Sequence, residues 1–74
     1  MPPRKLTGHA LDRLQQRGFS LEDIESALNR QYRRTPGQFG SIWVWGYAVN
    51  GEALKVCVAT DDENLVITAA WPGR

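Results

Sequence analysis

Cysteine and histidine are nearly missing from this chain of 74 residues, which contains one of each. A single cysteine excludes an internal disulfide, and one thiol with one imidazole cannot build the tetrahedral zinc clusters of many small domains. We therefore expect no metal ion and no other cofactor. Cys57 lies in an apolar strand pattern, so we interpret it as a small core or sheet-face residue and not as a nucleophile.

Long hydrophobic stretches are missing too. No apolar run approaches the roughly 20 residues of a membrane-spanning helix, and no signal-peptide core follows Met1. We expect a cytoplasmic protein with no membrane partner, although a domain clipped from a larger exported protein would look the same.

A strong net charge is absent as well, because nine basic and eight acidic residues leave a net charge of +1. The distribution is uneven. Residues 1–34 carry seven basic and four acidic side chains, whereas residues 35–74 carry two and four. Most of the basic residues are arginines, which can bind phosphate through two parallel hydrogen bonds. The basic half is therefore either a phosphate-binding surface or a solubilising helix surface.

Two helices are predicted in the first third of a single α+β domain that spans residues 1–74. Residues 1–6 are expected to form a mobile lead. Thr7 is a good N-cap for a helix over 8–17, and Gly18 can end that helix in a left-handed conformation. Ser20 predicts the start of the second helix. The apolar spacing predicts that the buried faces carry Ala10, Leu11 and Leu14 in the first helix, and Leu21, Ile24, Ala27 and Leu28 in the second.

Residues 30–40 are interpreted as a loop, and the sheet follows it. Segments 41–49, 53–59 and 65–71 are rich in β-branched and aromatic residues. Asn50 and Gly51 are a strong signal for a hairpin between the first two segments. The sequence therefore predicts two helices packed on an antiparallel meander of three strands, with four as the alternative.

Strand alternation predicts that one sheet face is unusually aromatic. With the helices packed on the aliphatic side, the other side carries Trp43, Trp45 and Tyr47 together with Lys55 and Thr68. In the last strand, Leu65, Ile67 and Ala69 would share one side, and Val66, Thr68 and Ala70 the other. The tryptophans can serve packing or a dimer contact, or they can stack nucleobases.

His9, Arg13 and Arg17 are spaced by four residues and therefore lie on one side of the first helix, beside its apolar stripe. A neutral imidazole can act as a general base, and two neighbouring arginines can stabilise a reacting phosphodiester. These are the minimum groups for attack of a ribose 2′-hydroxyl on the adjacent phosphate. The alternative is an ordinary solvated helix surface, on which such spacings are common.

The segment from Gly8 to Ser20, the helix after it and the final run from Leu65 to Trp71 resemble a small bacterial domain family of unknown function. That family occurs as standalone proteins and at the C-termini of toxins of the Rhs and contact-dependent-inhibition type. It is similar to the barnase–EndoU–colicin–RelE superfamily, whose members cleave RNA without a metal. The resemblance implies His9, Arg13, Arg17 and Thr68 as site residues.

Our hypothesis from the sequence is a toxin-like, metal-independent endoribonuclease or RNA-binding domain. His9 would be the general acid or base, Arg13 and Arg17 would bind phosphate, and Thr68 would position the substrate or an active-site side chain. The expected partners are RNA and a cognate antitoxin or immunity protein. The alternative is a non-enzymatic protein-interaction or homodimerisation module that uses the Trp43 and Trp45 face. The residues expected to contact RNA are Arg30, Arg33, Arg34, Trp43, Trp45, Tyr47 and Lys55.

Overall fold

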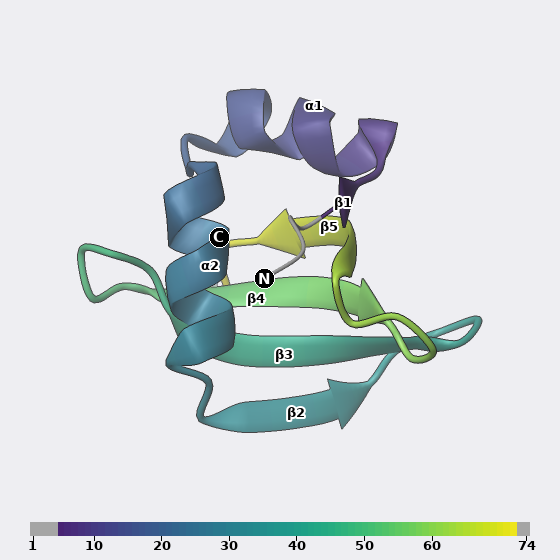
Figure 1. The fold of residues 1–74 in the computed structure, drawn as a ribbon. Coiled ribbons are helices and arrows are strands. Elements are labelled where there is room, and N and C mark those ends of the chain that lie inside the picture. The colour runs from purple at the N-terminus through teal and green to yellow at the C-terminus, as the bar shows by residue number, and fades with distance from the viewer. Residues whose placement is uncertain (1–4, 73–74) are drawn as a thin grey trace.

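A computed structural model describes residues 5–72 and shows two helices against a five-stranded mixed sheet (Figure 1). The sheet order is β1-β5-β4-β3-β2. Residues 1–4 of the expected mobile lead lie outside the described residues. The elements in chain order are β1 (Lys5–Leu6), α1 (Gly8–Arg17), α2 (Leu21–Asn29), β2 (Arg33–Pro36), β3 (Ser41–Tyr47), β4 (Ala53–Ala59) and β5 (Leu65–Ala70).

Both helices begin where the sequence predicts, and α1 also ends at the predicted residue. The Thr7 hydroxyl oxygen accepts a hydrogen bond from the Ala10 amide at 3.1 Å, and Gly18 follows α1 with φ 72°. Ser20 and Asp23 form a reciprocal capping box at the start of α2. These local hydrogen bonds satisfy the first amides of each helix, so the boundaries follow from side-chain chemistry near each end.

The predicted hairpin is confirmed. Strands β3 and β4 pair antiparallel, with Trp43 opposite Cys57 and Trp45 opposite Lys55. Gly51 has φ 87°, a conformation that glycine adopts without strain. The turn therefore fixes the register that places the tryptophans beside Lys55.

The prediction of three or four antiparallel strands is wrong in detail, because two short strands extend the sheet at both edges. Arg33–Pro36, interpreted as loop, pairs antiparallel with β3, and Lys5–Leu6 pairs parallel with β5. Neither segment has the apolar alternation of a strand. Each is held by the backbone groups that a longer neighbour leaves unpaired, and an edge strand tolerates a proline such as Pro36.

Some predicted core positions are also wrong. The exposed fractions of Leu11 and Leu21 are 51% and 47%, so neither belongs to the buried stripe of its helix. In β5 the register shifts opposite Cys57 and Val58, which puts Val66 and Ala69 on the same, buried face. A bulge adds one residue to the strand and reverses the alternation beyond it.

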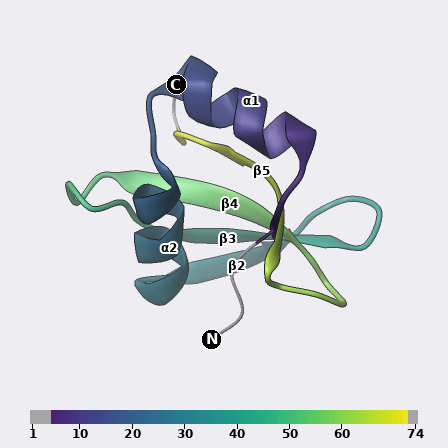
Figure 2. The same ribbon diagram turned by 45° about the horizontal axis from the view of Figure 1, so that its top comes forward.

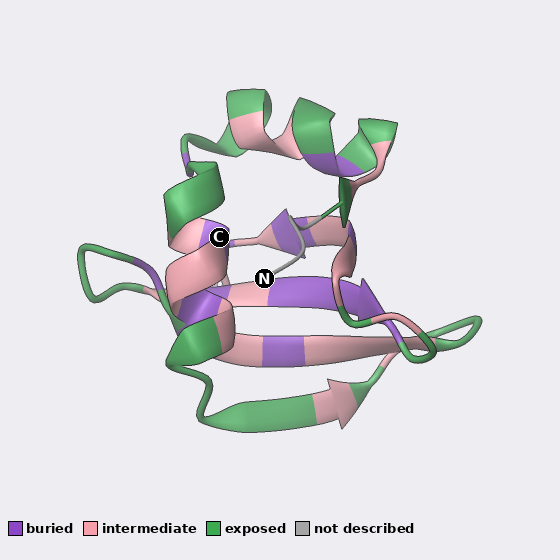
Figure 3. Cartoon of the chain, viewed as in Figure 1, coloured by how far each residue is buried: buried purple, intermediate pink, exposed green. Residues whose placement is uncertain are grey.

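The two helices cover different parts of the sheet. Helix α2 lies across one face, whereas α1 runs along β5 at the end of the sheet away from β2 (Figures 1 and 2). The buried side chains gather between α2 and the strands (Figure 3). Within residues 5–72, neither helix is long and apolar enough to cross a membrane. One sheet face is therefore left without a helix.

Gly46 permits the close contact between α2 and the sheet. A Cβ atom at this position would overlap the backbone carbonyl of Ala27 on α2. We predict that Gly46→Ala destabilises the fold by about 1–3 kcal/mol or more, because the helix must move away from β3.

The matched control is Gly8→Ala in the first turn of α1, where a Cβ atom meets nothing within 4 Å. Alanine there should leave stability unchanged or raise it by about 0.5–1 kcal/mol. Urea unfolding followed by circular dichroism measures both. Equal midpoints for the two variants would contradict the close contact.

Candidate nucleic-acid interface

The sheet face opposite α2 carries polar, aromatic and basic side chains from four strands. Pairing places Arg33 opposite Trp45, Thr35 opposite Trp43, Lys55 opposite Trp45 and Ala70, and Thr68 opposite Cys57. Their neighbours Val44, Val56 and Ala69 are buried under α2. We call the surface of these outward residues the open face, and its members are Arg33, Thr35, Trp43, Trp45, Tyr47, Lys55, Cys57, Thr68 and Ala70.

Cations and indole rings alternate across the centre of the open face. The Lys55 ammonium lies 4.6 Å from the centroid of Trp43 and 5.3 Å from that of Trp45. The Arg33 guanidinium lies 5.5 Å from the Trp45 ring. The indole N–H of Trp45 donates to the Thr35 hydroxyl at 3.0 Å. These contacts hold flat aromatic surfaces and positive charges side by side.

A second aromatic group continues this surface at the end of β3. Tyr47 stacks on Tyr32 with ring centroids 4.9 Å apart, and the Arg30 guanidinium lies 5.7 Å from the Tyr47 ring. Tyr32 is not among the predicted site residues, because residues 30–40 were predicted to form a loop. Arg34 points to the other side of β2 and pairs with Glu63 at 2.5 Å, so this predicted RNA contact lies away from the open face.

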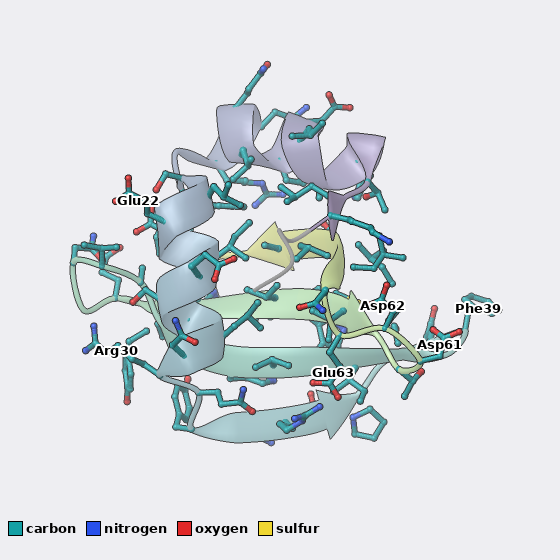
Figure 4. All side chains as sticks on the ribbon, in the orientation of Figure 1. Glu22, Arg30, Phe39, Asp61, Asp62 and Glu63 are labelled. Carbon is teal, nitrogen blue, oxygen red and sulfur yellow. The ribbon has the colours of Figure 1, made fainter. Side chains whose placement is uncertain are left out.

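None of the eight acidic residues of the chain lies in a strand. Asp61, Asp62 and Glu63 lie in the loop between β4 and β5, close to Phe39 at the tip of the hairpin between β2 and β3 (Figure 4). Glu22 lies at the start of α2 on the opposite side of the sheet. The open face therefore presents only positive charges, although the whole chain is nearly neutral.

His9 and Arg13 contact each other at the edge of the open face. The Nε of Arg13 donates to Nε2 of His9 at 3.4 Å, and a second Arg13 nitrogen donates to Gln16 at 3.0 Å. His9 is exposed and Arg13 is half-buried.

The direction of α1 decides which side this pair faces. The helix runs along β5 in the same direction, since the Thr7 hydroxyl donates to the Ile67 carbonyl and the Trp71 indole donates to the Arg17 carbonyl, each at 2.7 Å. Each residue turns about 100° around a right-handed helix. From buried Ala10, this rotation directs Leu11 toward the side of α2 and His9 with Arg13 toward the open face.

The four residues implied by the resemblance are thus brought only partly together. His9 and Arg13 touch, and Thr68 lies on the nearest strand of the same side. No hydrogen bond between described residues joins Thr68 to His9 or Arg13. Arg17 lies two helical turns beyond His9, at the end of α1 where its carbonyl contacts Trp71. His9, Arg13 and Thr68 thus lie on the same side of the molecule, and Arg17 is peripheral.

A pocket of about 410 Å³ opens at one end of the open face. Its lining residues are Pro36, Gly37, Gln38, Ser41, Trp43 and Cys57. This pocket could not be predicted from the sequence, because residues 30–40 have no strand signal and the pocket forms only when β2 pairs with β3. Among the described residues, no group of three or more histidine, cysteine or carboxylate side chains could hold a metal ion.

A family model for a domain of unknown function, DUF4258, matches residues 6–71. The chain belongs to the DUF4258 family. The DUF4258 match includes both helices, strands β2 to β5, the open face and the pocket. No curated protein and no solved structure matches the chain.

The hydrogen bond from Trp45 to Thr35 gives a direct test of the open face. We predict that Thr35→Val shifts one indole N–H signal and costs about 1 kcal/mol of stability, because the valine has no acceptor for the Trp45 indole. The measurement is a nitrogen–proton spectrum with a parallel melt.

The internal control is Trp71, whose indole donates to the Arg17 carbonyl at 2.7 Å on the other side of the sheet. Its signal should stay in place. Movement of all three indole signals, or of none, would contradict the described geometry.

Proposed function

We propose that this domain is a metal-independent endoribonuclease that binds single-stranded RNA across its open face and cleaves it beside α1. The main observation in support is the alternation of indole rings and cations, with Lys55 between Trp43 and Trp45. Bases stack on indole faces whatever their sequence, and cations bind the phosphates between them.

Charge supports RNA over self-association as the use of this surface. In a two-fold dimer the same patch meets itself. Lys55 and Arg33 of one copy would then approach Lys55 and Arg33 of the other, and no strand residue supplies a compensating carboxylate. Like charges in a closed interface cost several kcal/mol. RNA, in contrast, is a polyanion, so the same cations attract it.

His9 and Arg13 supply the chemistry of the proposed cleavage. Neutral His9 removes the proton of a ribose 2′-hydroxyl, and the resulting oxygen attacks the adjacent phosphorus. The bond from phosphorus to the 5′ oxygen breaks, and that oxygen takes a proton from the imidazolium or from water, which leaves a cyclic phosphate. Arg13 exchanges its hydrogen bond to His9 for one to the phosphate and stabilises the added negative charge. Thr68 donates its hydroxyl to the same phosphate.

A ribonuclease of this kind would act as a toxin in the cell that contains it. The sequence resemblance to RNA-cleaving toxin domains supports it, and an unregulated ribonuclease needs an antitoxin or immunity protein that covers the open face. Such an inhibitor would carry acidic side chains opposite Arg33 and Lys55, because electrostatic complementarity controls association rates.

RNA binding can be measured without cleavage on an oligonucleotide whose 2′-hydroxyls are methylated. We predict that Lys55→Met lowers the affinity about 10-fold and reduces the salt dependence by about one phosphate contact. Methionine keeps the length of the side chain against the two indoles and removes the charge.

Lys5→Met is the matched control, since Lys5 lies on β1 at the far edge of the sheet from Trp43 and Trp45, with its ammonium 4.0 Å from the Asp62 carboxylate. Its affinity should stay within about twofold of wild type. Equal losses for the two variants, or binding that is indifferent to salt, would rule out the open face as the RNA surface.

Cleavage of total cellular RNA tests the role of His9. With chelator present throughout, His9→Ala should reduce the rate by about 100- to 10,000-fold, as expected for loss of an acid–base group. Arg13→Ala should weaken both binding and rate, because its charge acts on the substrate and the transition state.

Gln15→Ala is the control on the outer surface of the same helix, and its rate should equal that of wild type. Melts of all variants exclude unfolding as the cause. Full cleavage by folded His9→Ala protein would remove His9 from the mechanism.

A further inference from the structure

The pocket beside Trp43 has the dimensions and lining of a site for one planar heterocycle. Its volume of about 410 Å³ lies at the lower end of the range for small-molecule pockets. Trp43 contributes an aromatic side chain to the lining, and Pro36, Gly37, Ser41 and Cys57 contribute to the rest of it. No charged residue is among the lining residues.

Only one face of Trp43 is available to a ligand. Lys55 pairs with Trp45, and its ammonium lies between the two indoles, 4.6 Å from the Trp43 centroid. Ser41 precedes Trp43 by two residues on β3 and therefore lies on the opposite side of the ring. The pocket opens on this second side, so a base that stacks on Trp43 must enter the pocket.

Gln38 gives the pocket a hydrogen-bonding group. Its side-chain amide bonds to no other described residue, and it presents a donor and an acceptor in one plane. Ser41 donates its hydroxyl to the Gln38 carbonyl at 2.6 Å, which fixes the backbone of the turn. A glutamine amide matches the N6 donor and N7 acceptor of adenine as a bidentate pair.

The pocket is one nucleotide away from the proposed cleavage site. Trp43, Cys57 and Thr68 form a row across β3, β4 and β5. Two strand spacings separate Trp43 from Thr68, about 10 Å. A base in the pocket would therefore lie within about two strand spacings of Thr68, on the side toward which His9 and Arg13 point.

From this arrangement we infer that the pocket between Trp43 and Gln38 binds an adenine base and selects the nucleotide beside the cleaved phosphate. The inference rests on the proposed RNA-binding function of the open face and adds base selectivity to it. Stacking on Trp43 supplies affinity, and the Gln38 amide supplies discrimination. The end of the open face that holds Tyr32 and Tyr47 accepts any base.

The test uses four labelled 2′-O-methyl homopolymers of about ten nucleotides, oligo(A), oligo(G), oligo(C) and oligo(U), so that no probe is cleaved. Wild type should bind oligo(A) about 10-fold more tightly than the other three, since a bidentate contact discriminates by a factor of this order. Gln38→Ala should remove this preference and leave the affinity for oligo(U) within about twofold of wild type. Gln15→Ala, on α1 away from the pocket, should retain the full preference.

Lys55→Met separates the pocket from the binding face, because it should weaken all four probes equally. If wild type binds the probes in a salt-sensitive, Lys55-dependent way but without base preference, or if Gln38→Ala keeps the preference, the pocket assignment is overturned and RNA binding stands. A preference for another base overturns the adenine assignment. If wild type binds none of the probes, the proposed function and this inference fall together.

Discussion

The contact between Gly46 and Ala27 determines how the rest of the molecule is arranged. Because β3 has no side chain at this position, α2 lies directly against the sheet. Helix α1 packs beside it along β5 and contributes Ala10 to the same core (Figure 2). The opposite face stays uncovered, and its aromatic rings are stabilised by cations and by the Thr35 hydroxyl.

The sequence predicted the features that depend on neighbouring residues. The caps at Thr7 and Ser20 and the turn at Gly51 are set by local hydrogen bonds and backbone conformation, and all three occur as expected. The alternation of β3 placed both tryptophans on one face for the same reason. Features that need a distant partner were missed: β1 and β2 exist only through pairing with β5 and β3, and the bulge in β5 needs the register of β4.

The candidate site also has features set by neighbouring residues and features that depend on distant partners. The spacing of His9 and Arg13 on one helix fixed their contact in advance. Their position relative to Thr68 depends on where α1 lies against β5, which no local pattern encodes. Arg34 lies away from the open face because the pairing of β2 with β3 directs its side chain toward Glu63. The pocket around Gln38 depends on the hairpin of β2 and β3, which the sequence did not predict. The arrangement of these residues is thus set by tertiary pairing, whereas the basic and aromatic composition is visible in the sequence.

Because α1 runs along the outer edge of β5, β2 is the sheet edge that remains open beside α2 (Figure 1). An open edge is a template on which other chains can add strands and polymerise. Here the edge is four residues long, two of them are arginines, and Pro36 removes one amide donor. The arginine that stacks on Trp45 therefore has a second effect, since its charge on this edge disfavours the pairing of another chain with β2.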